Sequence, residues 1–183
     1  DYCIGTNGTV ASVALFSQVP LEDIRTIQLD YQSRTSVNLV RILCEHHWEL
    51  EVEFKPANPG FEQNIQGNEA AVVIGDRAFA ALQQYPYVYD LGQAWKDFTG
   101  LPFVFAVWAA NKAIDPDFLD GFNRANGYGV QHINEVLEGF EYPLYDLKKY
   151  YTENIDYRLN DAKRQAIQLF HDYLKALPPI VTK

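Results

Sequence analysis

The sequence predicts an α/β protein with a mostly parallel sheet, and three patterns in its 183 residues support this. Short β-prone runs alternate with amphipathic helical periods through the first hundred residues. The run Ala70–Ile74 (AAVVI) is continuously apolar, as expected for a central parallel strand that is covered on both faces. From Asp115 onward only helical signals remain. Strand–helix alternation that ends in helices is typical of an α/β fold.

The first half of the chain supplies most of the predicted strands. Strands are expected at 1–4, 13–17, 25–29 and 50–54, where apolar and β-branched residues cluster or alternate. Pro20 begins a single helical turn at 20–24. An amphipathic helix is expected at 33–48, because five residues recur there at steps of three and four: Val37, Val40, Leu43, Cys44 and His47.

The second half is expected to contain three helices and one more strand. Short helices are predicted at 77–83 and 91–98. The apolar run Leu101–Ala110 is too short to cross a bilayer, so it is interpreted as a buried strand. A final helix is predicted at 160–177, with Asn160 as its N-cap. Its apolar stripe consists of Ala166, Leu169, Phe170, Tyr173, Leu174 and Leu177.

Composition limits the classes of partner. The net charge is −9, from 24 acidic and 15 basic residues spread along the chain. Such a surface disfavours nucleic acid and anionic membranes, because both require clusters of Lys and Arg. An anionic ligand would therefore need local positive potential at its site. No apolar run reaches the length of a membrane span, and we expect no membrane partner.

Cysteine content and the first residues bear on the compartment and on the chain ends. A disulfide between Cys3 and Cys44 is possible, but two reduced thiols in a cytoplasmic protein are the favoured interpretation. The sequence contains no Met and opens directly into a strand-like run at 1–4. We therefore expect a truncated or processed chain.

The segment Gly5–Ser12 is the first candidate for chemistry. Two glycines and interleaved polar side chains let a ligand approach the backbone closely. The candidate ligand contacts are Thr6, Asn7, Gly8 and Thr9, followed by Ser12. The spacing is not that of a dinucleotide-binding loop, and no helix follows. On spacing alone, an ordinary Gly/Asn turn is the favoured interpretation.

A second candidate lies at Ser33, Arg34, Thr35 and Ser36, where the predicted helix begins after a strand. Ligands of open α/β sheets gather at the carboxyl ends of strands. Free backbone N–H groups, the helix dipole, three hydroxyls and a guanidinium would meet there and could bind an anion without a metal. A helix simply capped by Ser33, with an exposed Arg34, is the equally weighted alternative.

Asp76 is the third candidate, since it follows the Ala70–Ile74 strand and precedes a helix. It could cap that helix, contact a ligand or act as an acid or base, and capping is the default interpretation. The four histidines show no spacing typical of a metal site, and no metal is expected. Motifs of serine hydrolases, P-loop enzymes and thiol redox enzymes are also missing from the sequence.

Four sequence blocks stand out along the chain: GTVASVALFSQVPLEDI, DYQSRTSVNLVRIL, AAVVIGDRA and YDLGQAWKDFTGLPFVFAVWA. Together, and in this order, they resemble the chorismate dehydratase family of the futalosine route to menaquinone, and the tail YYTENIDYRL is also similar. The resemblance implies a type II periplasmic-binding-protein-like fold, with two α/β lobes and the substrate between them. It also implies dehydration of chorismate to 3-[(1-carboxyvinyl)oxy]benzoate with no cofactor.

On this template, residues 1–12 cross over from the first lobe and 13–100 form the second lobe. Residues 101–183 then return as a strand and helices that pack on the first lobe. The N-terminal part of the first lobe is expected to be missing from this sequence. No residue here matches the functional asparagine near the family's N-terminus, so little turnover is expected from this exact chain.

The resemblance assigns Ser12 to the family's active-site serine and Ser33–Ser36 to its site at a helix N-terminus. Asp76 matches a position where amino-acid-binding relatives of the fold contact the ligand amine, which chorismate lacks. We expect the Ser33–Ser36 turn to bind one carboxylate and Ser12 to orient a carboxylate or the leaving hydroxyl. No matched residue is a convincing base, so a substrate carboxylate is expected to take the proton.

Three rival functions remain open at this stage. A non-catalytic solute-binding protein of the same fold would carry a signal peptide or lipid anchor upstream. The sister enzyme of the pathway, which makes a dihydroxynaphthoate, shares the fold but has a different motif before DLG. A regulatory effector-binding domain would carry a DNA-binding helix-turn-helix.

Overall fold

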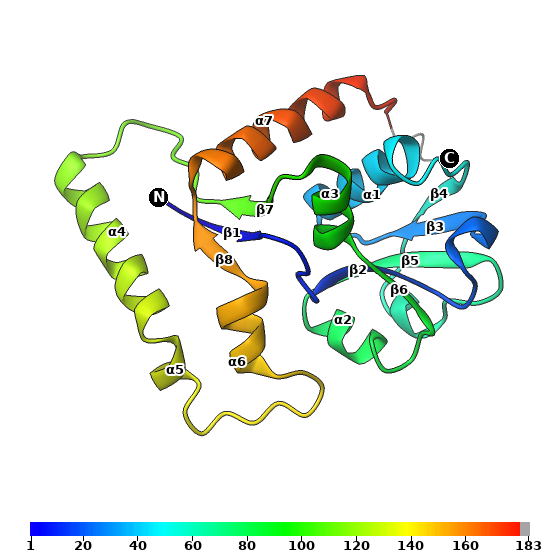
Figure 1. Cartoon of the computed structure of the whole chain (residues 1–183), viewed down its shortest axis with the longest axis horizontal. Helices are drawn as coiled ribbons and strands as arrows, with labels where there is room; N and C mark the ends of the chain where they lie inside the picture. Colours follow the sequence, from blue (N-terminus) through cyan, green and yellow to red (C-terminus); the bar gives the residue numbers. More distant parts are fainter. Residues whose placement is uncertain (180–183) are drawn as a thin grey trace.

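Two β-sheets organise the computed structural model, which describes residues 1–179 (Figure 1). The smaller sheet has the strand order β7-β1-β8, and both pairs are antiparallel. Its strands are β1 (Tyr2–Thr6), β7 (Phe103–Val107) and β8 (Asp156–Arg158). The larger sheet has five strands in the order β4-β3-β5-β2-β6. The predicted α/β class is confirmed.

The larger sheet is mixed rather than mostly parallel in its pairing. Its strands are β2 (Val13–Ser17), β3 (Thr26–Leu29), β4 (Glu53–Pro56), β5 (Glu69–Ile74) and β6 (Tyr87–Asp90). β3 runs parallel to β4 and β5, whereas β2 is antiparallel to both β5 and β6. β2 alone is reversed, because the chain enters this sheet from β1 and not through a crossover helix. The prediction that β5 is a central buried strand is correct, but one of its neighbours is antiparallel.

Helices cover both faces of the five-stranded sheet. On one face lie α1 (Arg34–His46) and α3 (Leu91–Thr99), while α7 (Asp161–Ala176) packs against α1 and against β7 of the smaller sheet (Figure 1). α2 (Asp76–Ala81) and η2 (Phe61–Gln63) cover the other face. The alternation of side chains along β2 serves both faces, since Leu15 packs in the first core cluster and Phe16 in the second. Trp95 is fully buried in the first cluster, with its ring edge-on to Phe103 and Phe170.

The remaining helical elements follow β7. They are α4 (Pro116–Gln131), α5 (Ile133–Val136), α6 (Leu147–Lys149) and the π-helix η3 (Tyr150–Asn154). A 3₁₀ turn, η1 (Leu21–Asp23), lies where a single helical turn is predicted. The N-cap of α7 is also predicted correctly, because the Asn160 side chain accepts a hydrogen bond from the Lys163 amide.

Three sequence predictions need correction. The strand expected at 50–54 begins at Glu53, and its side chains are mostly exposed because β4 is an edge strand. The run Leu101–Ala110 is not wholly buried: only residues 103–107 form β7, and Trp108 is 69 % exposed. The segment after Asp115 is not helical only, because Asp156–Arg158 pairs with β1. Within residues 1–179, no helix is long and apolar enough to cross a membrane.

Cys3 and Cys44 are both free and buried, so the alternative of a disulfide between them is wrong. Burial raises the pKa of the Cys44 thiol to about 12. Burial also raises the pKa of the Cys3 thiol, although the Lys163 ammonium acts in the opposite direction.

We expect neither cysteine to react with a disulfide reagent at about pH 8 while the protein is folded. A thiol must ionise to attack, and both pKa values are raised by burial. Titration with a chromogenic disulfide should find no reactive thiol in buffer and both thiols in guanidinium chloride. Rapid reaction of either thiol in the folded protein would contradict this.

Candidate functional site

The topology of the five-stranded sheet brings the predicted site segments to one edge. β3 and β5 are parallel and end at this edge, so residues 30–36 and 75–77 both follow a strand there. β2 begins at the same edge, since Val13 pairs with Ile74. The Gly75 amide donates a 2.8 Å hydrogen bond to the Ser12 carbonyl. Ser12, Asp76 and the start of α1 therefore belong to one edge of the sheet.

The residues Ser33–Ser36 form the N-terminus of α1. The Ser33 Oγ accepts a 3.0 Å hydrogen bond from the Ser36 amide and donates to the Ser36 Oγ at 2.9 Å. The predicted capping role of Ser33 is thus correct. Arg34 is exposed, Thr35 is half-buried and Ser36 is buried. Because Ser33 donates to Ser36, the hydroxyl hydrogen of Ser36 is left for another acceptor.

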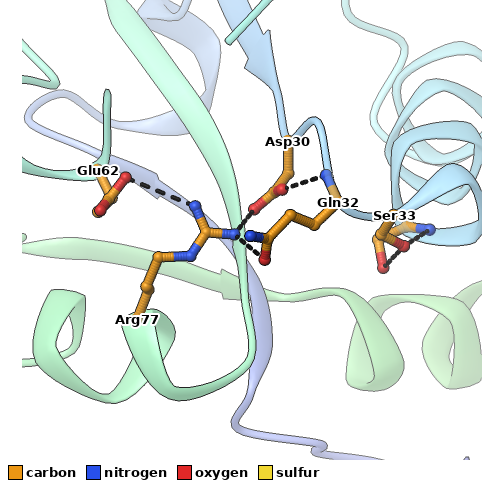
Figure 2. Close-up of polar contacts among 6 residues, drawn as sticks. Asp30, Gln32, Ser33, Glu62 and Arg77 are labelled. Carbon is orange, nitrogen blue, oxygen red and sulfur yellow. Dashed lines mark hydrogen bonds and ion pairs between the residues drawn. The ribbon is translucent and has the colours of Figure 1, made fainter. Parts of the chain in front are cut away.

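A buried ion pair fixes the turn that leads into α1 (Figure 2). The Asp30 side chain is fully buried, and its Oδ2 lies 2.6 Å from Arg77 Nη2 in α2. The same nitrogen donates to Gln32 Oε1 at 3.0 Å, while Asp30 Oδ1 accepts a hydrogen bond from the Gln32 amide at 2.8 Å. Arg77 Nη1 points toward Glu62 Oε2, 3.6 Å away. The guanidinium of Arg77 therefore joins the starts of α1 and α2.

Asp76 does not cap α2, contrary to the default prediction. Gly75 occupies the N-cap position with φ of 67°, a backbone conformation that glycine adopts without strain. Asp76 is the first residue of the helix and is exposed. Its carboxylate is therefore free of a capping role and lies in the first turn, where the helix dipole favours negative charge.

Ser12 is buried beside a tyrosine that the sequence patterns had not singled out. The Ser12 Oγ and the Tyr150 hydroxyl oxygen are 2.9 Å apart, and only 5 % of Ser12 is exposed. Burial raises the pKa of the Tyr150 phenol, an effect that the hydrogen bond to Ser12 opposes and the negative charge of Asp76 reinforces. The phenol therefore stays protonated and remains able to donate.

Asp90, at the end of β6, holds the loop that precedes Ser12. Its carboxylate accepts hydrogen bonds from the amides of Val10 at 3.1 Å and Ala11 at 2.7 Å. It also caps α3 by accepting one from the Gln93 amide at 2.9 Å. Burial raises the pKa of Asp90, and these backbone donors lower it. Ala11 has φ of 64°, a backbone conformation that a non-glycine residue rarely adopts. The hydrogen bonds to Asp90 stabilise this conformation.

The polar side chains between Gly5 and Val10 are mostly engaged within the protein. Thr6 Oγ1 donates to the carbonyls of Gly8 and Thr9 at 3.0 and 3.2 Å. Asn7 Oδ1 accepts from Lys96 Nζ at 3.0 Å. Thr9 Oγ1 donates to Gln93 Oε1 at 3.3 Å. These contacts are those of a structural turn. The four residues 6–9 line a depression of about 650 Å³ with residues of η3 and β8.

A second depression, of about 900 Å³, is largely apolar and lies between the three-stranded sheet and α4. Its lining includes Ile4, Trp108, Phe122 and Tyr151, and it includes none of the predicted site residues. Within residues 1–179, no group of three or more His, Cys, Asp or Glu side chains could hold a metal ion.

These features describe an α/β protein whose candidate site lies at one edge of a mixed sheet. Residues 1–176 match the family model described as menaquinone biosynthesis, and the chain belongs to that family. Among similar proteins is the chorismate dehydratase of Thermus thermophilus, which is 29 % identical over 204 residues. The match covers 95 % of this chain and 72 % of that protein. The predicted family resemblance is confirmed.

Proposed function

We propose that this protein is a cofactor-independent lyase that dehydrates chorismate to 3-[(1-carboxyvinyl)oxy]benzoate in the futalosine route to menaquinone. The match to the menaquinone biosynthesis family and the similarity to a chorismate dehydratase support the proposal. The observation that carries it is the shared sheet edge, at which Ser12, Ser33–Ser36 and Asp76 gather.

In this proposal, the N-terminus of α1 binds one carboxylate of chorismate. The helix dipole contributes roughly 0.3–2 kcal/mol there. Each hydrogen bond to a charged ligand group adds roughly 1.5–3 kcal/mol. The exposed Arg34 and the free hydroxyl hydrogen of Ser36 can supply such bonds. Two or three of them suffice to hold an anion on a protein with a net charge of −9.

Loss of water makes the ring of chorismate aromatic, so the reaction is energetically downhill. The protein must align the leaving hydroxyl, exclude water and stabilise the charge that develops. We assign Ser12 to orient the leaving hydroxyl or a carboxylate by a hydrogen bond. A carboxylate of the substrate takes the proton, and we assign the exposed Asp76, whose charge acts on the Tyr150 phenol, to contact the ring hydroxyl.

We further propose a two-lobed, type II periplasmic-binding-protein-like arrangement in the cytoplasm. Residues 1–12 then cross between lobes, 13–100 form the second lobe and 101–183 return to the first; residues 180–183 lie outside the described part. The arrangement is supported by the two separate sheets. The chain passes from the smaller sheet to the larger one between β1 and β2. Thr6, Asn7, Gly8 and Thr9 lie in that crossing and are secondary candidates for substrate contact.

The test is to incubate the protein with chorismate and to follow the product by mass spectrometry, with and without a metal chelator. Loss of one water, even at a low rate, that persists under chelation is the expected result. Binding of chorismate without conversion would favour the solute-binding alternative. Neither binding nor conversion would overturn the proposal.

The substitution Ser36→Ala should raise the KM for chorismate roughly 10-fold or more, because it removes one hydrogen bond to a charged carboxylate. Thermal unfolding serves as the control, since Ser33 keeps its bond to the residue 36 amide. An unchanged KM in a stable variant would remove Ser36 from the carboxylate site.

A further inference from the structure

The π-helix η3 (Tyr150–Asn154) is an unusual element that lies against the loop before β2. The Ile155 amide donates to the Tyr150 carbonyl at 3.0 Å, five residues back, which defines the π turn. Such turns are rare and are often found at functional sites. A π turn contains one residue more than an α-helical turn. It therefore shifts which side chains point toward a neighbouring segment.

Two side chains of η3 reach the loop that carries Ser12. Asn154 is buried, donates to the Thr9 carbonyl at 3.1 Å and accepts from the Tyr145 hydroxyl at 2.9 Å. Tyr150 meets Ser12 Oγ at 2.9 Å. Asp90 holds the amides of the same loop from β6. The loop is therefore fixed by contacts from two directions, and the hydroxyl of Ser12 receives its contact from Tyr150.

Packing fixes the ring of Tyr150 before any ligand binds. Phe79 of α2 lies edge-on to the Tyr150 ring at 5.1 Å and stacks on Tyr145 at 4.8 Å. Phe79 is itself buried, with 2 % of its surface exposed. A ring held in this way presents its hydroxyl at one place and loses little further entropy when it makes a hydrogen bond.

We propose that Tyr150 is a positioning residue for Ser12 and fixes the direction in which the serine hydroxyl donates; this rests on the proposed function. A serine hydroxyl has one hydrogen and two lone pairs, and its hydrogen otherwise rotates. When the Tyr150 phenol donates to Ser12 Oγ, one lone pair is occupied. The hydrogen of Ser12 is then available to the substrate carboxylate or the leaving hydroxyl.

The experiment compares Tyr150→Phe, Ser12→Ala, the double variant and Tyr151→Phe by steady-state kinetics with chorismate. Tyr151 is adjacent and exposed, so Tyr151→Phe is a matched control for loss of a phenol oxygen. We expect Tyr150→Phe to lower kcat roughly 3- to 10-fold with KM changed less than about 2-fold. In the Ser12→Ala background, Tyr150→Phe should cause no further loss, and Tyr151→Phe should match the wild type.

The outcomes separate the positioning role from the proposed function. Conversion of chorismate by the wild type, with Tyr150→Phe equally active, would overturn the positioning role alone. The positioning role alone would also be overturned if Tyr150→Phe lowered kcat by the same factor in the wild-type background and in the Ser12→Ala background. No conversion by the wild type would overturn the proposed function and the positioning role with it. Phenylalanine keeps the ring contact with Phe79, and circular dichroism checks that each variant is folded.

Discussion

Replacing Arg77 by methionine should lower the free energy of unfolding by about 3–5 kcal/mol. The substitution leaves the carboxylate of Asp30 buried with only the Gln32 amide as a remaining partner among the contacts described for residues 1–179. A buried charge without its counter-ion is costly, because neither water nor a neighbouring cation can solvate it. Arg77 also lies over the rings of Tyr31 and Phe61, at 5.4 and 5.5 Å, and these contacts are lost as well.

The measurement is urea unfolding followed by tryptophan fluorescence. Lys55→Met is the matched control, since Lys55 and Glu53 form an exposed ion pair at 3.4 Å. Its loss should cost less than about 1 kcal/mol. The double variant Asp30→Asn with Arg77→Met should recover part of the lost stability, because it removes the buried charge. If Arg77→Met costs no more than Lys55→Met, the ion pair does not stabilise the fold as argued.

The loss of Arg77 also matters for the candidate site. The ion pair joins Asp30, just before α1, to the first turn of α2, and it therefore holds two parts of the site edge together. Asp30 and Arg77 are 47 residues apart in the sequence. Neither strand pattern nor local spacing indicates that they meet, because their contact depends on the parallel pairing of β3 with β5.

Elements with a repeated burial pattern were predictable from the sequence. The helix α1 buries Val37, Val40, Leu43 and Cys44 as the periodicity predicted, although the helix ends at His46 and His47 is only half-buried at its C-cap. β2 matches its predicted bounds of 13–17. β5 is a continuous apolar run because helices cover both of its faces. In each case, one segment carries enough information to identify its own structure.

Elements whose environment is set by distant parts of the chain were harder to predict. β6 and β8 are short, and each pairs on one side only, so neither shows a clear alternation. β8 forms because it pairs with β1, which lies about 150 positions earlier in the sequence. The reversal of β2 is likewise a property of the path between the sheets and not of its residues.

The candidate site divides in the same way. Ser12, Ser33–Ser36 and Asp76 are identifiable because a ligand site of an α/β sheet follows the strand ends. Tyr150 lies 138 residues from Ser12, in a segment predicted to be helical without a stated function. A tyrosine-rich segment such as 142–151 gives no indication of which phenol meets the site. The partner of a predicted site residue therefore requires the fold.

The substitution Ser12→Ala should lower kcat/KM for chorismate roughly 10- to 150-fold, the range given by one lost hydrogen bond to a charged group. The proposal gives Ser12 a contact that is strongest as the hydroxyl leaves, so the loss should fall mainly on kcat. Loss of the serine also leaves Tyr150 with one hydrogen-bond partner fewer. A small decrease in stability should accompany the loss of activity.

Ser17→Ala is the matched control for this experiment. Ser17 is buried in the same strand β2 and pairs with Ala70, whereas Ser12 precedes the strand at the opposite edge of the sheet. Its hydroxyl oxygen accepts from the Val19 amide at 3.1 Å, so its removal also costs a hydrogen bond of a buried serine. Ser17→Ala should therefore lose a similar amount of stability and keep its turnover. The position of Ser12 at the site edge predicts a difference in activity between Ser12→Ala and Ser17→Ala at matched stability. Equal turnover in the two variants would therefore mean that Ser12 does not contact the reacting groups.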